Sequence, residues 1–203
     1  MTSPTATILV GDALTMLRTL PDASVNMCWT SPPYWGLRDY GVDGQLGLEP
    51  TPDAYIAAMV AVFREARRVL RDDGTLWLNV GDSYAASSNT GGTSSKQGTA
   101  KRVGAMTDKG HGIPPGLKPK DIVGIPWRLA FALQADGWYL RQDIIWAKPN
   151  PMPESVTDRC TKAHEYLFLL AKSERYYYDQ EAIKEPGRDW GSRDKTAAKH
   201  NTD

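Results

Sequence analysis

A short apolar run meets a proline corner in the stretch VNMCWTSPPYW, residues Val25–Trp35. The first part, Val25–Trp29, is almost continuously apolar, which is typical of a strand covered on both faces in a parallel sheet. Pro32 and Pro33 then end the strand, because each fixes its own φ and neither has a backbone N–H to donate. We therefore expect a buried strand followed by a stiff loop, within a single α/β domain.

The loop is rich in hydrogen-bond acceptors. Two successive prolines leave carbonyl groups unpaired, and Ser31 adds a hydroxyl oxygen beside the Pro32 carbonyl. Tyr34 and Trp35 supply flat faces on which a base could stack. Together these features suit a planar ring that carries an exocyclic amino group, whereas the simpler alternative is a proline corner that only closes an ordinary strand.

At these residues the sequence resembles a known family. Ser31-Pro32-Pro33-Tyr34 is similar to the catalytic (D/N/S)PP(Y/F/W) motif of DNA methyltransferases that modify exocyclic amines. Further segments resemble the beta class of that family, which places its catalytic half first. They are Gly11–Leu14, Leu20–Val25, Leu76–Tyr84 and Trp146–Pro153, so that the resemblance covers roughly residues 6–180.

The resemblance implies a fold, a cofactor and a reaction. The fold is an α/β Rossmann-like sheet, mostly parallel with an antiparallel edge hairpin, and the methyl donor is S-adenosylmethionine. The catalytic residues are Ser31, Pro32, Pro33 and Tyr34, which would hold the amino group of a base flipped out of double-stranded DNA. Serine at the first motif position favours cytosine N4 as the target, with adenine N6 as the alternative.

The same resemblance places Asp12 near the cofactor adenosine. The alternative for Asp12 is an ordinary N-cap of the helix that follows it.

One motif of the family is missing. The family binds S-adenosylmethionine through a glycine-rich FxGxG strand–turn–helix motif, and no such motif occurs in these 203 residues. We therefore expect the chain to be the N-terminal part of a longer enzyme or a degenerate copy, and to bind S-adenosylmethionine weakly or not at all by itself.

A long basic segment, Ala85–Lys120, interrupts the pattern of apolar periods. It is rich in Ser, Thr, Gly and Lys, and it predicts either a disordered insertion or a flexible loop that orders on a phosphate backbone. The predicted DNA-binding residues are Lys96, Lys101 and Arg102, together with Lys148 farther along. Whole-chain charge gives no support to nucleic-acid binding, because Lys+Arg and Asp+Glu both number 24.

Other periodic segments predict the remaining elements. The expected strands are Ala6–Val10, Thr75–Val80, Leu140–Trp146 and Glu165–Ala171, the last extended by Tyr176–Tyr178. The expected helices are a short one through Leu14, Leu17 and Leu20, one from Thr51 to about Asp72, and one from Ile125 to Ala135 with Trp127, Ala130, Phe131 and Leu133 in the core.

Composition limits the classes of protein. At 41% hydrophobic and 24% charged residues the chain is ordinary for a soluble protein, and it has no membrane-length apolar run, so a cytoplasmic location is expected. The two cysteines, Cys28 and Cys160, are expected to be reduced thiols, with no structural metal site. The predicted domains are a methyltransferase catalytic region over 1–183 and a polar tail, or the start of a target-recognition region, over 184–203.

Three classes of function remain. The first is a DNA amino-methyltransferase, in the setting of a restriction–modification system. The second is a DNA-binding fragment that cannot methylate, because most of the cofactor half is missing. The third is a methyltransferase for RNA or a small molecule that shares the catalytic loop. An unpaired strand edge would also need cover from a C-terminal half or from a second copy in a homodimer.

Overall fold

The structure is a computed structural model that describes residues 5–85 and 113–187. Its elements are α1 (Ala13–Arg18), β1 (Val25–Thr30), α2 (Pro52–Val69), β2 (Leu70–Val80), α3 (Ile125–Ala135), β3 (Tyr139–Ala147), β4 (His164–Ala171) and the 3-10 helix η1 (Glu181–Ile183). No helix within these ranges has the length and apolar character needed to cross a bilayer.

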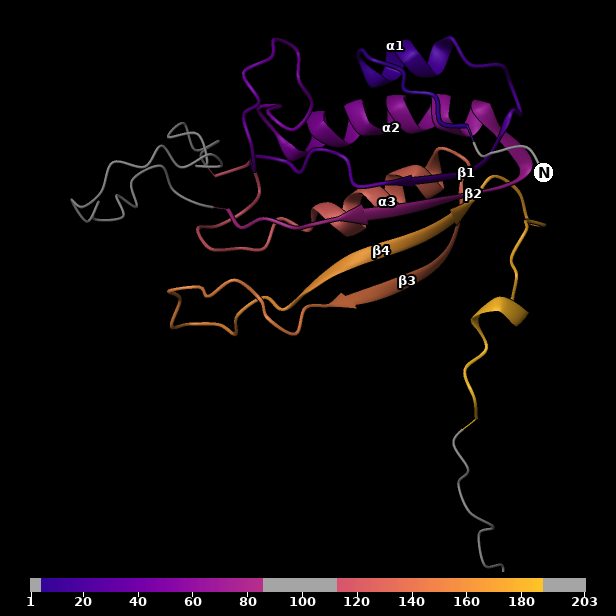
Figure 1. The fold of residues 1–203 in the computed structure, drawn as a ribbon. Coiled ribbons are helices and arrows are strands. Elements are labelled where there is room, and N and C mark those ends of the chain that lie inside the picture. The colour runs from indigo at the N-terminus through magenta and orange to yellow at the C-terminus, as the bar shows by residue number, and fades with distance from the viewer. Residues whose placement is uncertain (1–4, 86–112, 188–203) are drawn as a thin grey trace, which may run out of the picture.

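A four-stranded sheet in the order β1-β2-β4-β3 forms the centre of the fold (Figure 1). β1 runs parallel to β2, whereas β4 is antiparallel to both β2 and β3. The antiparallel hairpin of β3 and β4 at the sheet edge is therefore present as predicted. Among the described strands the parallel part is limited to β1 and β2, so that the sheet is mixed.

The helix layer covers one face of this sheet. Figure 1 shows α2 and α3 on the same side, and the alternate β2 residues Leu76, Leu78 and Val80 point into the core, with none of their surface exposed. α2 begins as predicted, because the Thr51 side chain caps it by accepting from Ala54 N at 3.1 Å and proline follows at the first turn.

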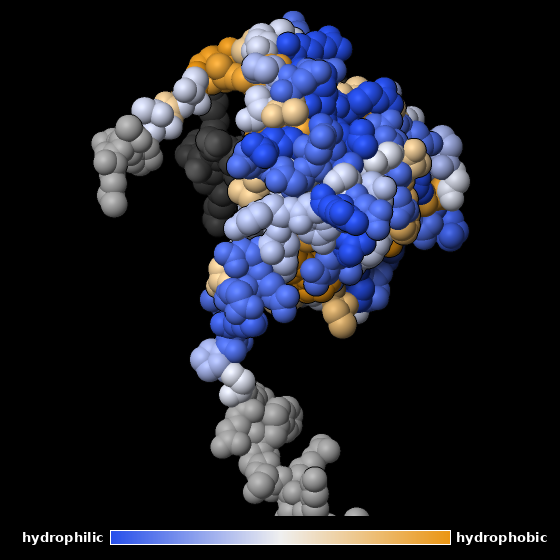
Figure 2. Space-filling view, turned by 90° about the vertical axis from the view of Figure 1, so that its right-hand side faces the viewer, coloured by the Kyte–Doolittle hydropathy of each residue, from blue (hydrophilic) through white to orange (hydrophobic). Residues whose placement is uncertain are grey.

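The opposite face of the sheet is open near β1. Met27 and Trp29 are 52% and 57% exposed, and Trp29 stacks on Trp77 with ring centroids 5.9 Å apart. The prediction that Val25–Trp29 is covered on both faces is therefore wrong. Within the described residues, no strand pairs with the outer edge of β1. Ala182 and Ile183 of η1 line a pocket on this face together with Met27 and Trp77. The molecular surface in Figure 2 is mostly hydrophilic, with orange patches where apolar side chains are exposed.

The predicted strand at Ala6–Val10 is absent. Ile8 and Val10 are 84% and 88% exposed, and the segment is irregular. An apolar run becomes a strand only when a neighbouring edge accepts its backbone hydrogen bonds, and this segment pairs with none of the described strands. The Tyr176–Tyr178 extension of β4 is likewise wrong, since β4 ends at Ala171 and Tyr177 is 70% exposed.

Two smaller predictions about the helices are also corrected. α2 ends at Val69 and β2 begins at Leu70, five residues before the predicted Thr75, because Leu70 pairs with Val25 of β1 across an irregular register. Phe131 is 55% exposed and packs against Trp127 at the surface, whereas Ala130 and Leu133 are buried as predicted. Both cysteines are free thiols.

Candidate active site

The parallel pairing of β1 and β2 brings two strand ends together. Thr30 is opposite Leu78 in the register, so the next residues along each strand, Ser31 and Asn79, become neighbours. The Ser31 hydroxyl lies 3.3 Å from Asn79 Oδ1 and can donate to it. This is the carboxyl edge of the parallel strands, where open α/β sheets place their ligands.

Tyr34 lies across this edge. Its hydroxyl donates to Asn79 Oδ1 at 2.9 Å or to Glu165 Oε2 at 3.2 Å. Its ring packs directly on Gly81, where a Cβ atom would lie 2.6 Å from Tyr34 Cε2. A glycine is therefore required immediately after β2, because any side chain there would displace the tyrosine ring.

Contacts with the hydrophobic core fix the other residues of the proline loop, Pro33 and Trp35. The Pro33 carbonyl accepts from the hydroxyl of Tyr55 at 2.9 Å, and Tyr55 is completely buried on α2. Trp35 is only 6% exposed, and its indole N–H donates to the Glu49 carbonyl at 2.9 Å. Two expectations are therefore wrong, since the Pro33 carbonyl is paired and Trp35 offers no free stacking face. Among the described residues, the Pro32 carbonyl has no hydrogen-bond partner.

Glu165 enters the site from β4. Its Oε2 accepts from Asn79 Nδ2 at 3.3 Å as well as from Tyr34, and its Oε1 pairs with the Lys148 ammonium. The second amide proton of Asn79 goes to the Tyr166 carbonyl at 3.1 Å, which orients Asn79 Oδ1 toward Ser31 and Tyr34. The antiparallel β3–β4 hairpin thus supplies a charged pair beside the parallel strand ends.

The ionisation states follow from these contacts. Partial burial raises the pKa of Glu165, but the hydrogen bonds from Lys148 and Asn79 and the lysine charge outweigh it, so the pKa lies below its ordinary value. Burial raises the pKa of Tyr34, and the negative charge of Glu165 raises it further. At neutral pH the site therefore holds an ionised carboxylate and a neutral tyrosine.

The predicted residues are distributed unevenly. Ser31, Pro32, Pro33 and Tyr34 lie together at the site, and Lys148 joins them through its ion pair with Glu165, with its side chain 40% exposed. Asp12 lies at the start of α1, where its carboxylate accepts from Thr15 N at 2.8 Å and Thr15 Oγ1 at 2.7 Å. Lys96, Lys101 and Arg102 lie outside the described residues.

Asn79 and Glu165 are the site residues that sequence reasoning missed. Each is a polar side chain inside an otherwise apolar strand, in LWLNV and in HEYLFLLA. A largely buried polar group is an informative departure from strand patterning, because it must find a partner. Asn79 is 5% exposed, so an asparagine within an apolar strand was the sequence signal that could have identified it.

The fit to S-adenosylmethionine is incomplete in the described residues. A nucleoside-binding turn presents free backbone N–H groups at a helix N-terminus. Two described glycine turns lead into helices, at Gly11 and at Gly124. Asp12 already accepts from Thr15 N, and Asp82 Oδ1 already accepts from Gly124 N and Ile125 N. The described residues therefore supply the acceptor side of a transfer site, without a cradle for adenosine.

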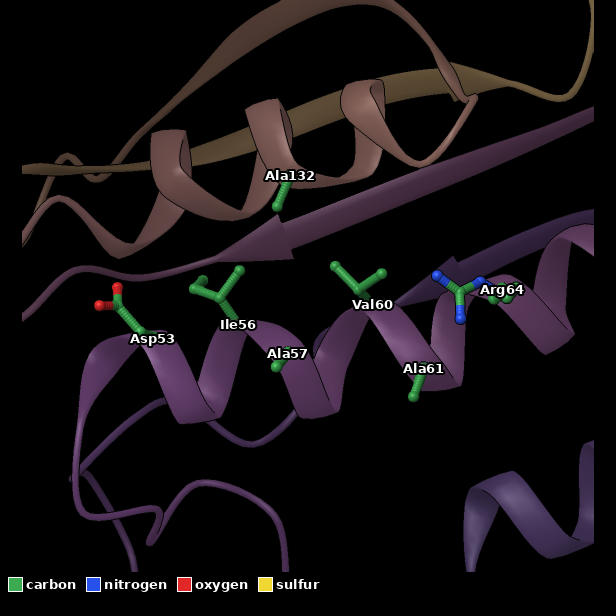
Figure 3. A pocket seen from close by; sticks show the side chains of 7 residues that line it. All are labelled: Asp53, Ile56, Ala57, Val60, Ala61, Arg64 and Ala132. Atoms are coloured by element: carbon green, nitrogen blue, oxygen red, sulfur yellow. The ribbon is translucent and has the colours of Figure 1, made fainter.

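A groove between α2 and α3 is separate from this site (Figure 3). Its volume is about 380 Å³, and small or aliphatic side chains such as Ile56, Val60 and Ala132 line most of it. The two charged groups at its ends have local partners, since Asp53 pairs with Arg128 and Arg64 pairs with Asp136. The groove offers no cluster of groups suited to proton or group transfer.

Sequence comparison matches the chain to a family model described as DNA methylase, over residues 25–203. Type II methyltransferase M.Cfr9I of Citrobacter freundii is 55% identical over 190 residues, covering 94% of this chain and 62% of the relative. Type II methyltransferase M.SmaI of Serratia marcescens is 55% identical over 182 residues, covering 90% and 61% respectively. The chain therefore spans about six tenths of the length of these relatives.

Solved structures share the fold at low sequence identity. The PvuII DNA methyltransferase, named as cytosine-N4-specific, aligns with a TM-score of 0.56 and 16% identity, over 84% of this chain and 50% of that chain. A protein of Thermus thermophilus described as a DNA modification methylase, solved as a complex with S-adenosylmethionine, aligns with a TM-score of 0.54 and 24% identity, over 85% and 56%. These likenesses concern the fold alone.

Proposed function

The chain belongs to the DNA methylase family of N6/N4 amino-methyltransferases, and from this premise we propose that it carries the catalytic site of an enzyme that methylates the exocyclic amine of a DNA base. The family uses S-adenosylmethionine as methyl donor. The observation that carries the proposal is the pair of acceptors at the proline loop. Ser31 Oγ and the Pro32 carbonyl are adjacent, and neighbouring groups hold the loop around them in place.

The proposed mechanism begins with a base flipped out of the duplex. Its amino group donates to Ser31 Oγ and to the Pro32 carbonyl, while the base stacks on Tyr34. The Ser31 hydroxyl can donate to Asn79 Oδ1 or to Tyr34 Oη, each at 3.3 Å, and either bond leaves the lone pairs of Ser31 free to face the amino group. Two acceptors on the amino protons localise the nitrogen lone pair, so that the nitrogen can attack a methyl group directly.

S-adenosylmethionine, when bound, supplies that methyl group on a sulfonium centre. The residues of this chain orient the acceptor nitrogen and hold it, with no covalent enzyme intermediate. Cytosine C5 chemistry needs a cysteine nucleophile that follows a proline, and here Cys28 follows Met27 while Cys160 follows Arg159. Neither cysteine takes part in the proposed reaction.

Cytosine N4 is the preferred target base, with adenine N6 as the second candidate. Serine at the first motif position supports cytosine. The test is mass spectrometry of nucleosides from DNA exposed to the full-length protein, meaning this chain with any further sequence that its gene encodes. We expect N4-methylcytosine, whereas N6-methyladenine without N4-methylcytosine would overturn the choice of base.

The catalytic role of the loop has its own test. In the full-length protein, Tyr34→Ala removes both the stacking ring and the hydroxyl, so methyl transfer to DNA should be abolished while affinity for S-adenosylmethionine stays nearly unchanged. Radiolabelled methyl transfer and calorimetric titration measure the two properties separately. Unchanged turnover in this variant would contradict the assignment.

Double-stranded DNA is the proposed substrate, and a type II restriction–modification system is the proposed setting; relatives named type II methyltransferases support this choice. Lys96, Lys101 and Arg102 stay predicted DNA contacts, as does Lys148, which also pairs with Glu165. Removing one cation that binds a phosphate should reduce the salt dependence of DNA affinity by about one unit of slope. Titrations of single Lys→Met variants at several salt concentrations measure this slope.

Residues 1–203 by themselves form, in this proposal, a catalytic half-site that binds S-adenosylmethionine weakly or not at all. The support is the incomplete fit described above and the unpaired outer edge of β1 among the described strands. Calorimetric titration of residues 1–203, beside the full-length protein, is the direct test. Micromolar binding by residues 1–203 alone would contradict it, and no transfer by the full-length protein would favour the DNA-binding fragment instead.

A further inference from the structure

Three side chains form a continuous hydrogen-bonded path through the site. The Ser31 hydroxyl lies 3.3 Å from Tyr34 Oη and can donate to it, and Tyr34 Oη lies 3.2 Å from Glu165 Oε2 and can donate in turn. The path begins at an exposed hydroxyl on the proline loop and ends at a carboxylate whose side chain is 19% exposed. It therefore connects the acceptor loop to a half-buried base on a different strand.

Only one end of this network is built to take up a proton. Asn79 is closer to Tyr34, at 2.9 Å, but a side-chain amide does not accept a proton at ordinary pH. Glu165 is ionised, since Lys148 and Asn79 both donate to it. Its negative charge also needs these partners, because an unpaired carboxylate at this depth would be costly.

We propose that Glu165 is the final acceptor of the proton that leaves the target amine, and that the proton reaches it through the hydroxyls of Ser31 and Tyr34. This inference rests on the proposed function. It goes beyond the proline loop itself by assigning the destination of the proton to a residue of β4. Glu165 and Tyr34 then act through Ser31, which is the group that touches the amine.

The step balances in atoms and electrons. A bond forms between the amine nitrogen and the methyl carbon as the bond from that carbon to the donor sulfur breaks, and the electron pair of the broken bond goes to sulfur. An N–H bond of the amine also breaks, with its electron pair remaining on nitrogen. The released proton passes to Ser31 Oγ, the original Ser31 proton passes to Tyr34 Oη, and the original Tyr34 proton passes to Glu165 Oε2. Glu165 becomes a neutral acid beside the Lys148 ammonium, and it returns the proton to water afterwards.

The test is the pH profile of single-turnover methyl transfer by the full-length protein. Wild-type rates should be flat from pH 6 to pH 8.5, because the pKa of Glu165 lies below its ordinary value and the acceptor is ionised throughout. Glu165→Gln keeps nearly the same size but removes the basic oxygen. We expect about a 10²-fold loss at pH 6 that recovers as pH rises, since hydroxide replaces the missing base.

Tyr34→Phe breaks the path in the middle while keeping the ring, so it should show the same pH dependence. The double variant should lose little more than either single variant, because both changes interrupt one path. Asp143→Asn is the matched control, since Asp143 is an exposed carboxylate on the neighbouring strand β3. Its profile should match that of the wild type.

A second measurement does not depend on turnover. Carbon-13 NMR of labelled glutamate carboxyl groups, assigned by loss of one signal in Glu165→Gln, should show Glu165 ionised from pH 5 upward. A Glu165 signal that titrates near or above pH 7 would overturn the proposal, because a neutral acid cannot accept the proton.

The outcomes separate the inference from the function it rests on. If the wild type transfers methyl groups but Glu165→Gln loses rate equally at every pH, Glu165 is only a support and the proton path is wrong. A wild-type profile in Tyr34→Phe would overturn the path too. If the wild-type protein methylates no DNA base under any condition, the proposed function itself fails.

Discussion

Gly81→Ala is expected to disable the site without unfolding the protein. Gly81 lies directly after β2, and the Tyr34 ring packs on it so closely that a Cβ atom would lie 2.6 Å from Cε2 and 2.9 Å from Cδ2. Ordinary van der Waals contact begins at 3.4 Å, so the ring must retreat by at least about 0.8 Å. Because Tyr34 lies partly at the surface, the ring can move aside and no large loss of stability should follow.

The displacement decides the magnitude of the effect. A retreat of that size would stretch the 2.9 Å hydrogen bond from Tyr34 to Asn79 beyond hydrogen-bonding distance. Misplacing a catalytic group by about 1 Å can cost about 10²-fold in rate, or about 2.7 kcal/mol of barrier. We therefore expect the single-turnover rate of Gly81→Ala to fall about 10²-fold, with a small change in melting temperature.

The assay is labelled methyl transfer to DNA by the full-length protein, with thermal denaturation in parallel. Gly187→Ala is the matched control, because a Cβ atom at Gly187 meets no atom within 4 Å and its φ is not left-handed. A Gly81→Ala variant with wild-type rate would refute the idea that the position of the Tyr34 ring governs the reaction.

Three further predictions concern stability. Tyr55→Phe should lower the free energy of unfolding by about 1 kcal/mol in urea denaturation, because the Pro33 carbonyl loses its donor; an unchanged value would show that water replaces it. Leu78→Ala should cost about 2–5 kcal/mol in the same assay, since Leu78 is fully buried between the sheet and the helices, and a loss below about 1 kcal/mol would contradict that packing. Glu165 has a pKa below its ordinary value of 4.5, so its stabilising contribution is fully present above that value and is lost as pH falls through the lower folded pKa. Acid titration should therefore lower the free energy of unfolding of the wild type more than that of Glu165→Gln below pH 4.5. Lys148→Met should raise the pKa of Glu165, because it removes the paired ammonium. Equal loss of stability in acid for the wild type and Glu165→Gln would refute the lowered pKa of Glu165.

Local chemistry accounts for the elements that sequence reasoning predicted well. Thr51 with Pro52 predicted the start of α2, because an N-cap and a proline at the first turn act within a few residues. The proline pair predicted the end of β1 for the same reason, since the missing N–H groups belong to the prolines themselves. The motif at Ser31–Tyr34 also pointed to the candidate catalytic loop before any geometry was known.

Predictions failed where the outcome depends on a distant partner. Ala6–Val10 has the composition of a strand, but strand formation needs an edge that the described residues do not provide. Trp35 looked like a stacking surface, yet the core encloses it and the Glu49 carbonyl takes its N–H. Burial of an aromatic side chain depends on the residues that pack against it. Those residues are distant in the sequence, so the neighbouring residues do not predict the burial.

The sequence by itself determined the proline loop, its acceptor chemistry and the family to which the chain belongs, because these depend on residue types at fixed local spacing. Only the tertiary structure showed which acceptors stay free. The Pro33 carbonyl accepts a hydrogen bond from Tyr55 on α2. Glu165 on β4 lies 131 residues after Tyr34 and accepts a hydrogen bond from the Tyr34 hydroxyl. Strand order and register bring these groups within hydrogen-bonding distance, and both arise from long-range pairing in the sheet.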